Sequence, residues 1–309
     1  MNRYFRGIKK FLLNKNWRTS LFFQLGVYDN VDDEEYLRMK FKLRMGKELN
    51  LSSPKTFNEK IQWLKLYDRK PLYTTLVDKY EVKKYVANII GEEHIIPTIG
   101  IWNSFDDITF DSLPNQFVLK CTHDSGGLAI CRDKNSFNIK AAQKKIDFCM
   151  RRNYFMENRE WPYKNVPHRI IAEQYMVDES GYELKDYKFF CFDGEPRFLY
   201  LSKGLENHST ASISFVNLDW SFASFKRSDY KAFRILPEKP ENFEEMINIA
   251  RVLSAGYPFL RVDLYNIAGK IFFSELTFSP CGGMLPFEPE EWDYRLGELI
   301  QLPEFLGGG

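Results

Sequence analysis

The sequence contains no long apolar run and no paired cysteine motif. No stretch approaches the roughly 20 apolar residues that a membrane-spanning helix needs, and no apolar signal-peptide segment opens the chain. The cysteines are odd in number and form no C-x-x-C pair, which argues against a disulfide framework or a zinc site. We therefore expect a cytoplasmic protein. The five cysteines are Cys121, Cys131, Cys149, Cys191 and Cys281.

An excess of charge of either sign is also missing. Lysine and arginine number 43 against 42 aspartate and glutamate residues, so no global field attracts nucleic acid or an anionic membrane. Any anion-binding site must be local. Hydrophobic residues make up 44% of the chain, which excludes a disordered protein. At 309 residues the chain has room for two or three modules of about 100 to 200 residues each.

Three sequence motifs that often mark nucleotide or sugar-nucleotide sites are absent. The chain has no G-x-x-x-x-G-K-[ST], no G-x-G-x-x-G and no D-x-D segment. The first absence excludes a Walker A phosphate loop. The other two argue against a nucleotide-sugar glycosyltransferase, which stays as the weakest alternative.

The apolar patterns predict a mixture of helices and antiparallel strands. Thr56 followed by Glu59 is a capping-box signature for a helix that ends near Tyr67. Asp193-Gly194 has the composition of a type I′ hairpin turn, and Ala268-Gly269 separates a second pair of strand-like runs. We therefore predict an α+β fold and not a doubly wound parallel sheet. The other expected helices cover residues 32–49, 72–90, 136–154 and 241–256, and short strands are expected at 95–97, 99–102, 116–120, 169–176, 187–192, 197–201, 212–217, 259–266 and 270–276.

Residues 1–26 interleave basic and apolar side chains. On a helix, the apolar positions fall on one face. Such a helix could lie on the cytoplasmic surface of a membrane, or it could pack on its own domain with a solvated basic face. Both interpretations stay open. The apolar positions are Tyr4, Phe5, Ile8, Phe11 and Leu12.

A strand that ends in Lys120 runs into a polar loop with two glycines. Backbone N–H groups of such a loop can approach phosphate oxygens because glycine has no Cβ, and the lysine adds a positive charge beside them. Ser125, Gly126 and Gly127 are the loop residues best suited to this role. An ordinary turn is the alternative interpretation.

Near the other end of the chain, a predicted hairpin brings two acids and a hydroxyl together. Alternation along the strands puts Arg261 and Asp263 on one face of the first strand, and Glu275 and Thr277 on one face of the second. Oxygen ligands of this kind suit Mg²⁺ bound to nucleotide phosphates. The alternative is a simple cross-strand charge pair between Arg261 and Glu275.

Taken together, six short segments resemble the ATP-grasp enzymes in order and spacing. The stretch 57–303 resembles the TupA-like branch, named for teichuronopeptide synthesis, in its F-N-E-K-I-Q-W start and its P-F-E-P-E-E-W-D end. The resemblance implies two α+β lobes that clasp ATP, with a helical N-terminal extension. It divides the chain into an extension (1–50), an N-terminal α/β region (51–113), a small lobe (114–177) and a large lobe (178–309). The six segments are Asp78-Lys79, 117–127, 171–176, 186–188, 261–263 and 275–277.

The resemblance also implies roles in binding MgATP. Phosphates would be held by lysines, the glycine loop would close over them, and the hinge between the lobes would hold the adenine. Either Asp178 or Glu179 would bind the ribose. Thr277 stands where many ATP-grasp enzymes carry asparagine. The implied phosphate ligands are Lys79, Lys120, Lys188, Ser125, Gly126 and Gly127; the adenine contacts are Glu173, Tyr175 and Met176; and the Mg²⁺ ligands are Asp263, Glu275 and Thr277.

The implied activity is ATP-dependent ligation of a carboxylate to an amine. Arg261, Lys120 and His123 would act in catalysis, although His123 could equally order its loop. The family implies a uronic acid of a bacterial surface glycan, free or lipid-linked, and an amino acid as the amine. Members are often labelled glycosyltransferases. A sugar or polysaccharide kinase on the same fold is the main alternative, because its site would contain nearly the same residues.

Overall fold

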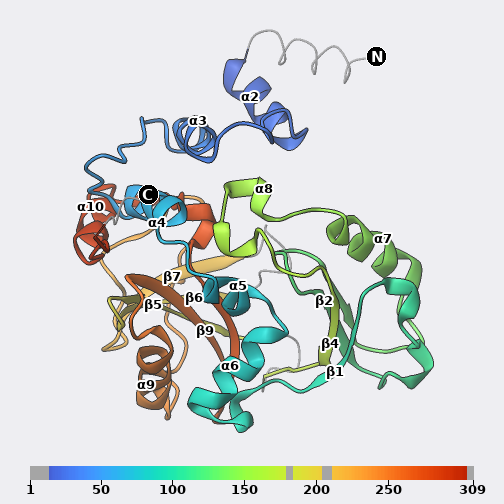
Figure 1. Cartoon of the computed structure of the whole chain (residues 1–309). Helices are drawn as coiled ribbons and strands as arrows, with labels where there is room; N and C mark the ends of the chain where they lie inside the picture. Colours follow the sequence, from blue (N-terminus) through green and yellow to red (C-terminus); the bar gives the residue numbers. More distant parts are fainter. Residues whose placement is uncertain (1–13, 179–183, 204–210, 305–309) are drawn as a thin grey trace.

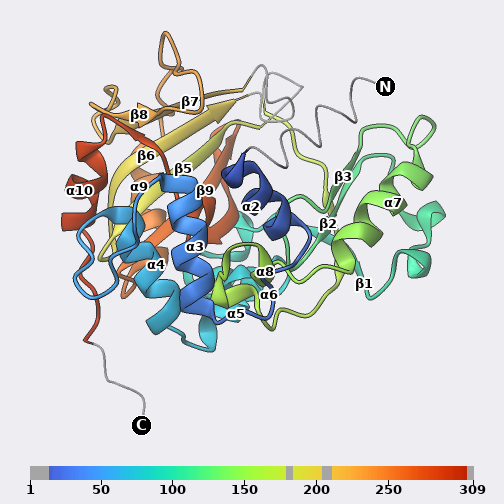
Figure 2. The same cartoon turned by 90° about the horizontal axis from the view of Figure 1, so that it is seen from above.

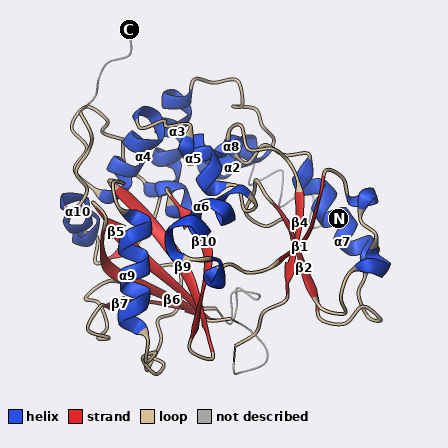
Figure 3. Ribbon diagram, turned by 60° about the horizontal axis from the view of Figure 1, so that its bottom comes forward, coloured by secondary structure: helices blue, strands red, loops and turns tan. Residues whose placement is uncertain are grey.

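The computed structural model describes residues 14–178, 184–203 and 211–304, and it contains two antiparallel sheets with helices packed around them (Figure 1). The two sheets stand side by side, and a group of helices lies across one end of both (Figure 3). This architecture confirms the predicted α+β fold. None of the helices in the described ranges is long and apolar enough to cross a membrane.

The N-terminal helices lie over the rest of the molecule (Figure 2). The predicted basic helix is described only from residue 14 onward, since residues 1–13 lie outside the described ranges. The described part of this helix packs on the next helix along the chain, where the centres of the Phe23 and Tyr36 rings lie 5.0 Å apart. Arg159 is 1% exposed and donates a hydrogen bond to the carbonyl of Asp29 at 2.7 Å, which anchors this region to the body. The helices are α2 (Lys15–Gln24), α3 (Asp33–Met45) and α4 (Phe57–Tyr67).

The predicted capping box at the start of α4 is confirmed. The Thr56 hydroxyl accepts a hydrogen bond from the Glu59 N–H at 3.1 Å, and the Glu59 carboxylate accepts one from the Thr56 N–H at 3.1 Å. These two bonds satisfy donors that a helix start leaves open. Phe57 and Ile61 then enter the core against the large sheet.

One long helix was predicted over residues 72–90, and this prediction is wrong. The segment forms α5 (Leu72–Val77) and α6 (Glu81–Ile90), with Asp78 extended between them. Asp78 is 1% exposed; its carboxylate accepts from the Tyr80 N–H at 2.8 Å and binds Arg169 at 2.7 Å. A distant ion pair therefore breaks the helix, and the break sets Lys79 beside the glycine loop, where its N–H bonds to the Thr122 carbonyl at 3.1 Å.

Replacing Asp78 by alanine is expected to destabilise the protein by about 3 kcal/mol, because it breaks a buried ion pair and removes a helix cap. Urea unfolding followed by circular dichroism measures this change. Asp111→Ala, at an exposed position, is the matched control and should change the unfolding free energy by less than about 0.5 kcal/mol. A similarly small change for Asp78→Ala would contradict the account of the helix break.

The small sheet has the strand order β1-β4-β2-β3 and is entirely antiparallel. The helix α7 (Ile139–Met150) covers one face, and its residue Ile146 packs with Phe117 and Ile170 of the sheet. The edge strand β1 is only half-buried, although a buried strand was predicted there. It belongs to this sheet and not to a separate N-terminal region. The strands are β1 (Thr98–Trp102), β2 (Phe117–Cys121), β3 (Leu128–Cys131) and β4 (Ile170–Gln174).

The large sheet has the order β10-β9-β5-β6-β7. Both predicted hairpin turns are present, and both of their central residues have positive φ: 49° at Asp193 and 78° at Gly194, then 50° at Ala268 and 75° at Gly269. That pattern is the one a type I′ turn requires. The elements are β5 (Asp186–Phe192), β6 (Glu195–Lys203), β7 (Ser212–Asn217), β9 (Phe259–Ile267) and β10 (Lys270–Thr277), with α9 (Phe243–Ser254), α10 (Glu291–Glu298) and the two-stranded pair β8 (Lys226–Arg227) and β11 (Phe287–Glu288).

Alternation along β5 decides which side chains face the small sheet. Tyr187 and Phe189 pack with α9 in one apolar core. Asp186 and Lys188 therefore point from the opposite face, toward the space between the sheets. Short helical turns complete the fold: α8 (Phe155–Asn158), η1 (Glu92–His94), η2 (Phe105–Asp107), η3 (Phe110–Ser112), η4 (Trp161–Tyr163) and η5 (Pro280–Gly283).

Candidate nucleotide site

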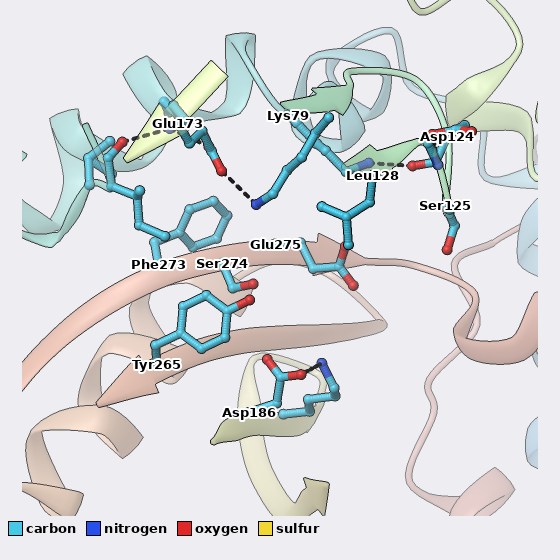
Figure 4. Close-up of a pocket in the computed structure, with 17 residues that line it drawn as sticks. Lys79, Asp124, Ser125, Leu128, Glu173, Asp186, Tyr265, Phe273, Ser274 and Glu275 are labelled. Atoms are coloured by element: carbon cyan, nitrogen blue, oxygen red, sulfur yellow. Dashed lines mark hydrogen bonds and ion pairs between the residues drawn. The ribbon is translucent and has the colours of Figure 1, made fainter. Parts of the chain in front are cut away.

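A cavity of about 330 Å³ lies between the two sheets (Figure 4). The small sheet, the helix break and the glycine loop form one wall, and strands β5, β9 and β10 form the other. Four lysines and four acids contribute to the walls, so the space is strongly polar. The lining residues are Lys79, Lys83, Ile95, Ile96, Lys120, Asp124, Ser125, Gly126, Gly127, Leu128, Glu173, Asp186, Lys188, Tyr265, Phe273, Ser274 and Glu275.

The structure brings together eight of the residues that the sequence suggested for binding ATP and Mg²⁺. They come from five separate parts of the chain. The residues are Lys79, Lys120, Ser125, Gly126, Gly127, Glu173, Lys188 and Glu275.

The glycine loop is held in place at both ends. Gly126 has φ of +124°, a conformation that side-chain-bearing residues rarely adopt. A Cβ added at Gly127 would lie 2.6 Å from the Cys121 sulfur, so this position has no space for a side chain. The Gly127 N–H donates to the Asp124 carboxylate at 3.2 Å, and the Lys79 ammonium donates to the Asp124 carbonyl. The loop is thus tied to the helix break.

Glu173 forms two short ion pairs and does not have an open carboxylate. One oxygen lies 2.5 Å from the Lys83 ammonium and the other 2.5 Å from the Lys120 ammonium. Burial raises the pKa of Glu173, but the charges of Lys120 and Lys83 outweigh it and bring the pKa to about 2. Burial lowers the pKa of Lys120, and the nearby Glu173 charge more than reverses that effect. Lys120 therefore stays protonated at every physiological pH.

The depressed pKa of Glu173 has a consequence for stability. The group contributes stability above its usual pKa of 4.5, and this contribution is lost as the pH falls toward its folded-state pKa of about 2. We expect Glu173→Gln to cost about 3 kcal/mol at pH 7, with a smaller difference from the wild type at pH 3. Urea unfolding at both pH values, with the exposed Glu241→Gln as control, measures the two differences. Equal differences at the two pH values would contradict this assignment.

Charged residues of the large sheet form one cross-strand row. Lys188, Asp263 and Glu275 are direct neighbours on β5, β9 and β10. The Lys188 ammonium lies 2.8 Å from Asp263, and Arg261 binds Asp263 through both oxygens at 2.7 and 2.6 Å. Arg261 also binds Glu275 at 2.7 Å. The predicted convergence of acids on this hairpin is therefore present, together with the cross-strand ion pair that was its alternative.

The acids of this row differ in their freedom to bind a metal. Asp263 is 0% exposed, and both of its oxygens are held by cationic side chains. Glu275 is 39% exposed and lines the cavity. Thr277 donates to Glu275 at 3.3 Å and lies outside the lining. Within the described ranges, no three His, Cys, Asp or Glu residues cluster closely enough to hold a metal ion by themselves.

Several suggested residues lie outside the cavity lining. His123 is 1% exposed, its ring stacks on His168 at 3.7 Å and its Nε2 bonds to the Cys149 carbonyl at 3.2 Å. A catalytic role for this ring does not fit such a position, and it orders the small lobe instead. Tyr175 also lies outside the lining, and its hydroxyl accepts a hydrogen bond from Arg132 at 3.1 Å. Arg261, Asp263, Thr277, Met176 and Asp178 also lie outside the lining, and Glu179 lies outside the described residues.

Lys83 and Asp186 are two charged lining residues to which the sequence analysis gave no role. Lys83 lies four residues after Lys79, but the assumed continuous helix hid its position at the start of a new helix. Asp186 lies two residues before Lys188, and strand alternation alone places both on one face. That signal was available in the Asp186-Tyr-Lys188 segment.

Two antiparallel lobes around a cavity lined by lysines and a glycine loop define an anion-binding, nucleotide-type site. A family model described as TupA-like ATPgrasp matches residues 59–301. Since the match spans most of the chain, the protein belongs to the TupA-like ATP-grasp family. The ATP-grasp fold implies an ATP-dependent enzyme of the ligase type.

Solved structures give more distant likenesses. D-alanine–D-alanine ligase from Bacillus anthracis, in complex with ATP, is 14% identical with a TM-score of 0.39; the match covers 66% of this chain and 55% of that one. The Helicobacter pylori D-alanine–D-alanine ligase is 13% identical with a TM-score of 0.41, covering 79% and 69%. PurK, an N5-carboxyaminoimidazole ribonucleotide synthetase in complex with ADP, is 15% identical with a TM-score of 0.43, covering 71% and 50%. This chain thus spans about half the length of two of these proteins. A search of curated proteins finds no match.

Proposed function

We propose that this protein binds MgATP in the cavity between its sheets and uses it to join a carboxylate to an amine. The observation that carries the proposal is the cavity itself: four lysines, a glycine loop and a partly exposed glutamate, in a member of the ATP-grasp family. Lysine ammonium groups and loop N–H groups are the donors that polyphosphates require. By its resemblance to the TupA-like branch, named for teichuronopeptide synthesis, the reaction would belong to bacterial surface-polysaccharide assembly.

Lysine side chains, the glycine loop and the backbone at the hinge would contact different parts of the nucleotide. Lys79, Lys120 and Lys188 would bind the phosphates, with Ser125, Gly126 and Gly127 closing over them. The ion pair with Glu173 uses one of the three Lys120 donors, which leaves two for phosphate oxygens. Because Glu173 is occupied by lysines, the backbone at Tyr175 and Met176 would hold the adenine edge.

The residues present fit a magnesium ion that arrives with the nucleotide. Mg²⁺ is commonly held by one or two carboxylates plus substrate phosphates, and Glu275 offers such a carboxylate at the cavity wall. Asp263 could join it only by giving up a contact with Arg261 or Lys188. When bound, Mg²⁺ would neutralise phosphate charge. Thr277 would orient Glu275 through its hydroxyl.

The reaction would proceed in two displacements. An oxygen of the substrate carboxylate attacks the γ-phosphorus of ATP, which breaks the bond to the β-phosphate oxygen and yields an acyl phosphate and ADP. The amine then attacks the acyl carbon, and phosphate leaves with the proton of the amine transferred to solvent. Arg261, one row beyond the phosphate-binding lysine, would stabilise the charge that develops on the transferred group and the tetrahedral oxyanion.

The substrate class rests on the family resemblance. The carboxylate would belong to a uronic acid of a capsule, O-antigen or teichuronic-type glycan, and the amine to an amino acid. A lipid-linked glycan in the cytoplasmic leaflet would be within reach of a protein in the cytoplasm or peripheral to that leaflet.

An isotope experiment distinguishes this reaction from its alternatives. D-glucuronate labelled with ¹⁸O in its carboxylate is incubated with the protein, MgATP and a mixture of amino acids, and the released phosphate is analysed by mass spectrometry. A ligase transfers one labelled oxygen to phosphate. Phosphate that stays on a sugar hydroxyl would establish a kinase instead. Transfer of glucose from UDP-glucose to a glycan without ATP would establish a glycosyltransferase.

A further inference from the structure

Helix α7 presents a basic face to solvent. Residues 139–152, which are α7 and the two residues after it, contain five lysines and arginines and one acid, whereas the whole chain is almost neutral. Lys140, Lys144 and Arg151 recur at helical spacing, so they lie on one face of the helix. Ile146 lies on the opposite face, in the core of the small lobe. The five cations are Lys140, Lys144, Lys145, Arg151 and Arg152, all exposed, and the acid is the half-buried Asp147.

Most of this positive charge is not neutralised by the protein itself. Lys140, Lys144 and Arg151 form no ion pair with another residue in the described ranges. Arg152 differs, because it is paired with Glu157. Cations that gather on one helix face without acidic partners create a local positive potential, even on a protein of nearly zero net charge. Such a face attracts an anionic partner.

An aromatic ring stands among these cations. Phe148 follows Lys144 by one helical turn, lies on the same face and is 55% exposed. The Arg152 guanidinium lies 5.1 Å from the centre of the Phe148 ring. An aromatic ring that is left in water would gain free energy from burial in an apolar phase. Basic residues around an exposed aromatic ring are the combination that a helix on an anionic membrane surface uses.

We propose that the α7 face, made of Lys140, Lys144, Phe148 and Arg151, docks the protein on an anionic lipid surface. The three cations would contact lipid phosphates, and Phe148 would enter the boundary between the headgroups and the acyl chains. A soluble polyanion, such as a polymer of uronic acid, would satisfy the cations equally well. It would offer no apolar phase for Phe148, which is why the face fits a lipid surface better.

The position of α7 connects this face to the small lobe. The helix lies on the outer side of the small sheet, away from the large sheet (Figure 3). Its C-terminal end contacts the segment that leads into the glycine loop, because the His123 Nε2 atom bonds to the Cys149 carbonyl at 3.2 Å. The His168 Nδ1 atom bonds to the next carbonyl, that of Met150, at 2.8 Å. Docking through α7 would therefore hold the small lobe, and with it the glycine loop, at a lipid surface.

Co-sedimentation with lipid vesicles tests the inference, whatever the cavity binds. Vesicles made of equal parts of phosphatidylglycerol and phosphatidylcholine are compared with vesicles of phosphatidylcholine alone. Each basic residue near an anionic membrane strengthens binding about fivefold, so the wild type should bind the anionic vesicles about 100-fold more tightly than the neutral ones. The triple variant Lys140→Gln, Lys144→Gln, Arg151→Gln should lose this 100-fold preference. Phe148→Ser should bind the anionic vesicles about 10-fold more weakly than the wild type.

The matched control is the triple variant Lys84→Gln, Arg234→Gln, Lys270→Gln, which has the same change in net charge at exposed positions outside α7. It should bind the anionic vesicles as the wild type does. Every variant should keep the wild-type melting temperature, because none of the replaced side chains is buried. A change in vesicle binding therefore reports on the surface and not on folding.

Three results would overturn the inference. The first is a wild-type protein that binds anionic and neutral vesicles equally. The second is an α7 triple variant that binds like its charge-matched control, while replacement of the basic residues within 1–13 by glutamine abolishes binding; the contact would then lie in that segment. The third is a Phe148→Ser protein that binds vesicles as the wild type does and a wild type that binds soluble polygalacturonate through the same cations. The α7 face would then be a site for an acidic glycan and not for lipid. The basic residues within 1–13 are Arg3, Arg6, Lys9 and Lys10.

Discussion

Replacement of Lys120 by methionine is expected to weaken the binding of MgADP by about 100-fold, equivalent to about 2.7 kcal/mol. Lys120 lines the cavity, is held by Glu173 at 2.5 Å and stays protonated, so it supplies a fixed positive charge where phosphates would lie. Methionine keeps a similar length and removes only the charge and the donors. Isothermal titration measures the dissociation constant of each protein.

The matched control for Lys120→Met is Lys144→Met, at an exposed position on α7. This variant carries the same change in net charge and should bind MgADP as the wild type does. An equal, small loss in both variants would mean that only the overall charge matters. In that case the cavity lysine has no direct contact with the nucleotide.

Replacement of Arg261 by lysine is expected to lower the rate of ADP release about 100-fold and to change the affinity for MgADP by less than about threefold. Arg261 lies outside the cavity lining, and its guanidinium binds Asp263 and Glu275 at the same time. Lysine keeps the charge but cannot make this forked contact. The effect should therefore fall on the transfer step and leave nucleotide binding nearly intact.

ADP release by the Arg261→Lys variant is measured with a coupled assay, in the presence of D-glucuronate and an amino-acid mixture. Titration of the same protein with MgADP gives the affinity. A weaker affinity with an unchanged rate would place Arg261 in nucleotide binding and not in catalysis. Arg151→Lys, at an exposed position at the end of α7, is the control for the substitution itself.

Much of the large lobe could be predicted from local sequence. Two turns with glycine at the second position and strands with a period of two define both hairpins, but a β-bulge between Phe273 and Glu275 is needed to bring Glu275 opposite Asp263 and Thr277 opposite Arg261. The turns and the alternation depend on neighbours in the sequence. Local patterns therefore predicted the hairpin that carries the acids, and the bulge that pairs Glu275 with Asp263 is seen only in the structure.

The features that local patterns did not reveal depend on contacts between distant residues. The apolar periodicity continues through Asp78 and hides the break, which depends both on the local cap of the Tyr80 N–H by Asp78 and on the ion pair with Arg169, 91 residues away. Sequence order alone likewise does not reveal that Lys83 and Lys120 meet the carboxylate of Glu173. The stacking of His123 on a second histidine is likewise a product of the folded lobe.

The most direct test of the central claim is the melting temperature of the wild-type protein with MgATP, with a non-hydrolysable ATP analogue and with UDP-sugars. At a ligand concentration 100 times its dissociation constant, binding adds about 2.7 kcal/mol to the stability of the native state, which corresponds to a rise of about 5 °C or more. The account predicts this rise for both ATP ligands and none for UDP-sugars. A rise with UDP-sugars and none with ATP would contradict it.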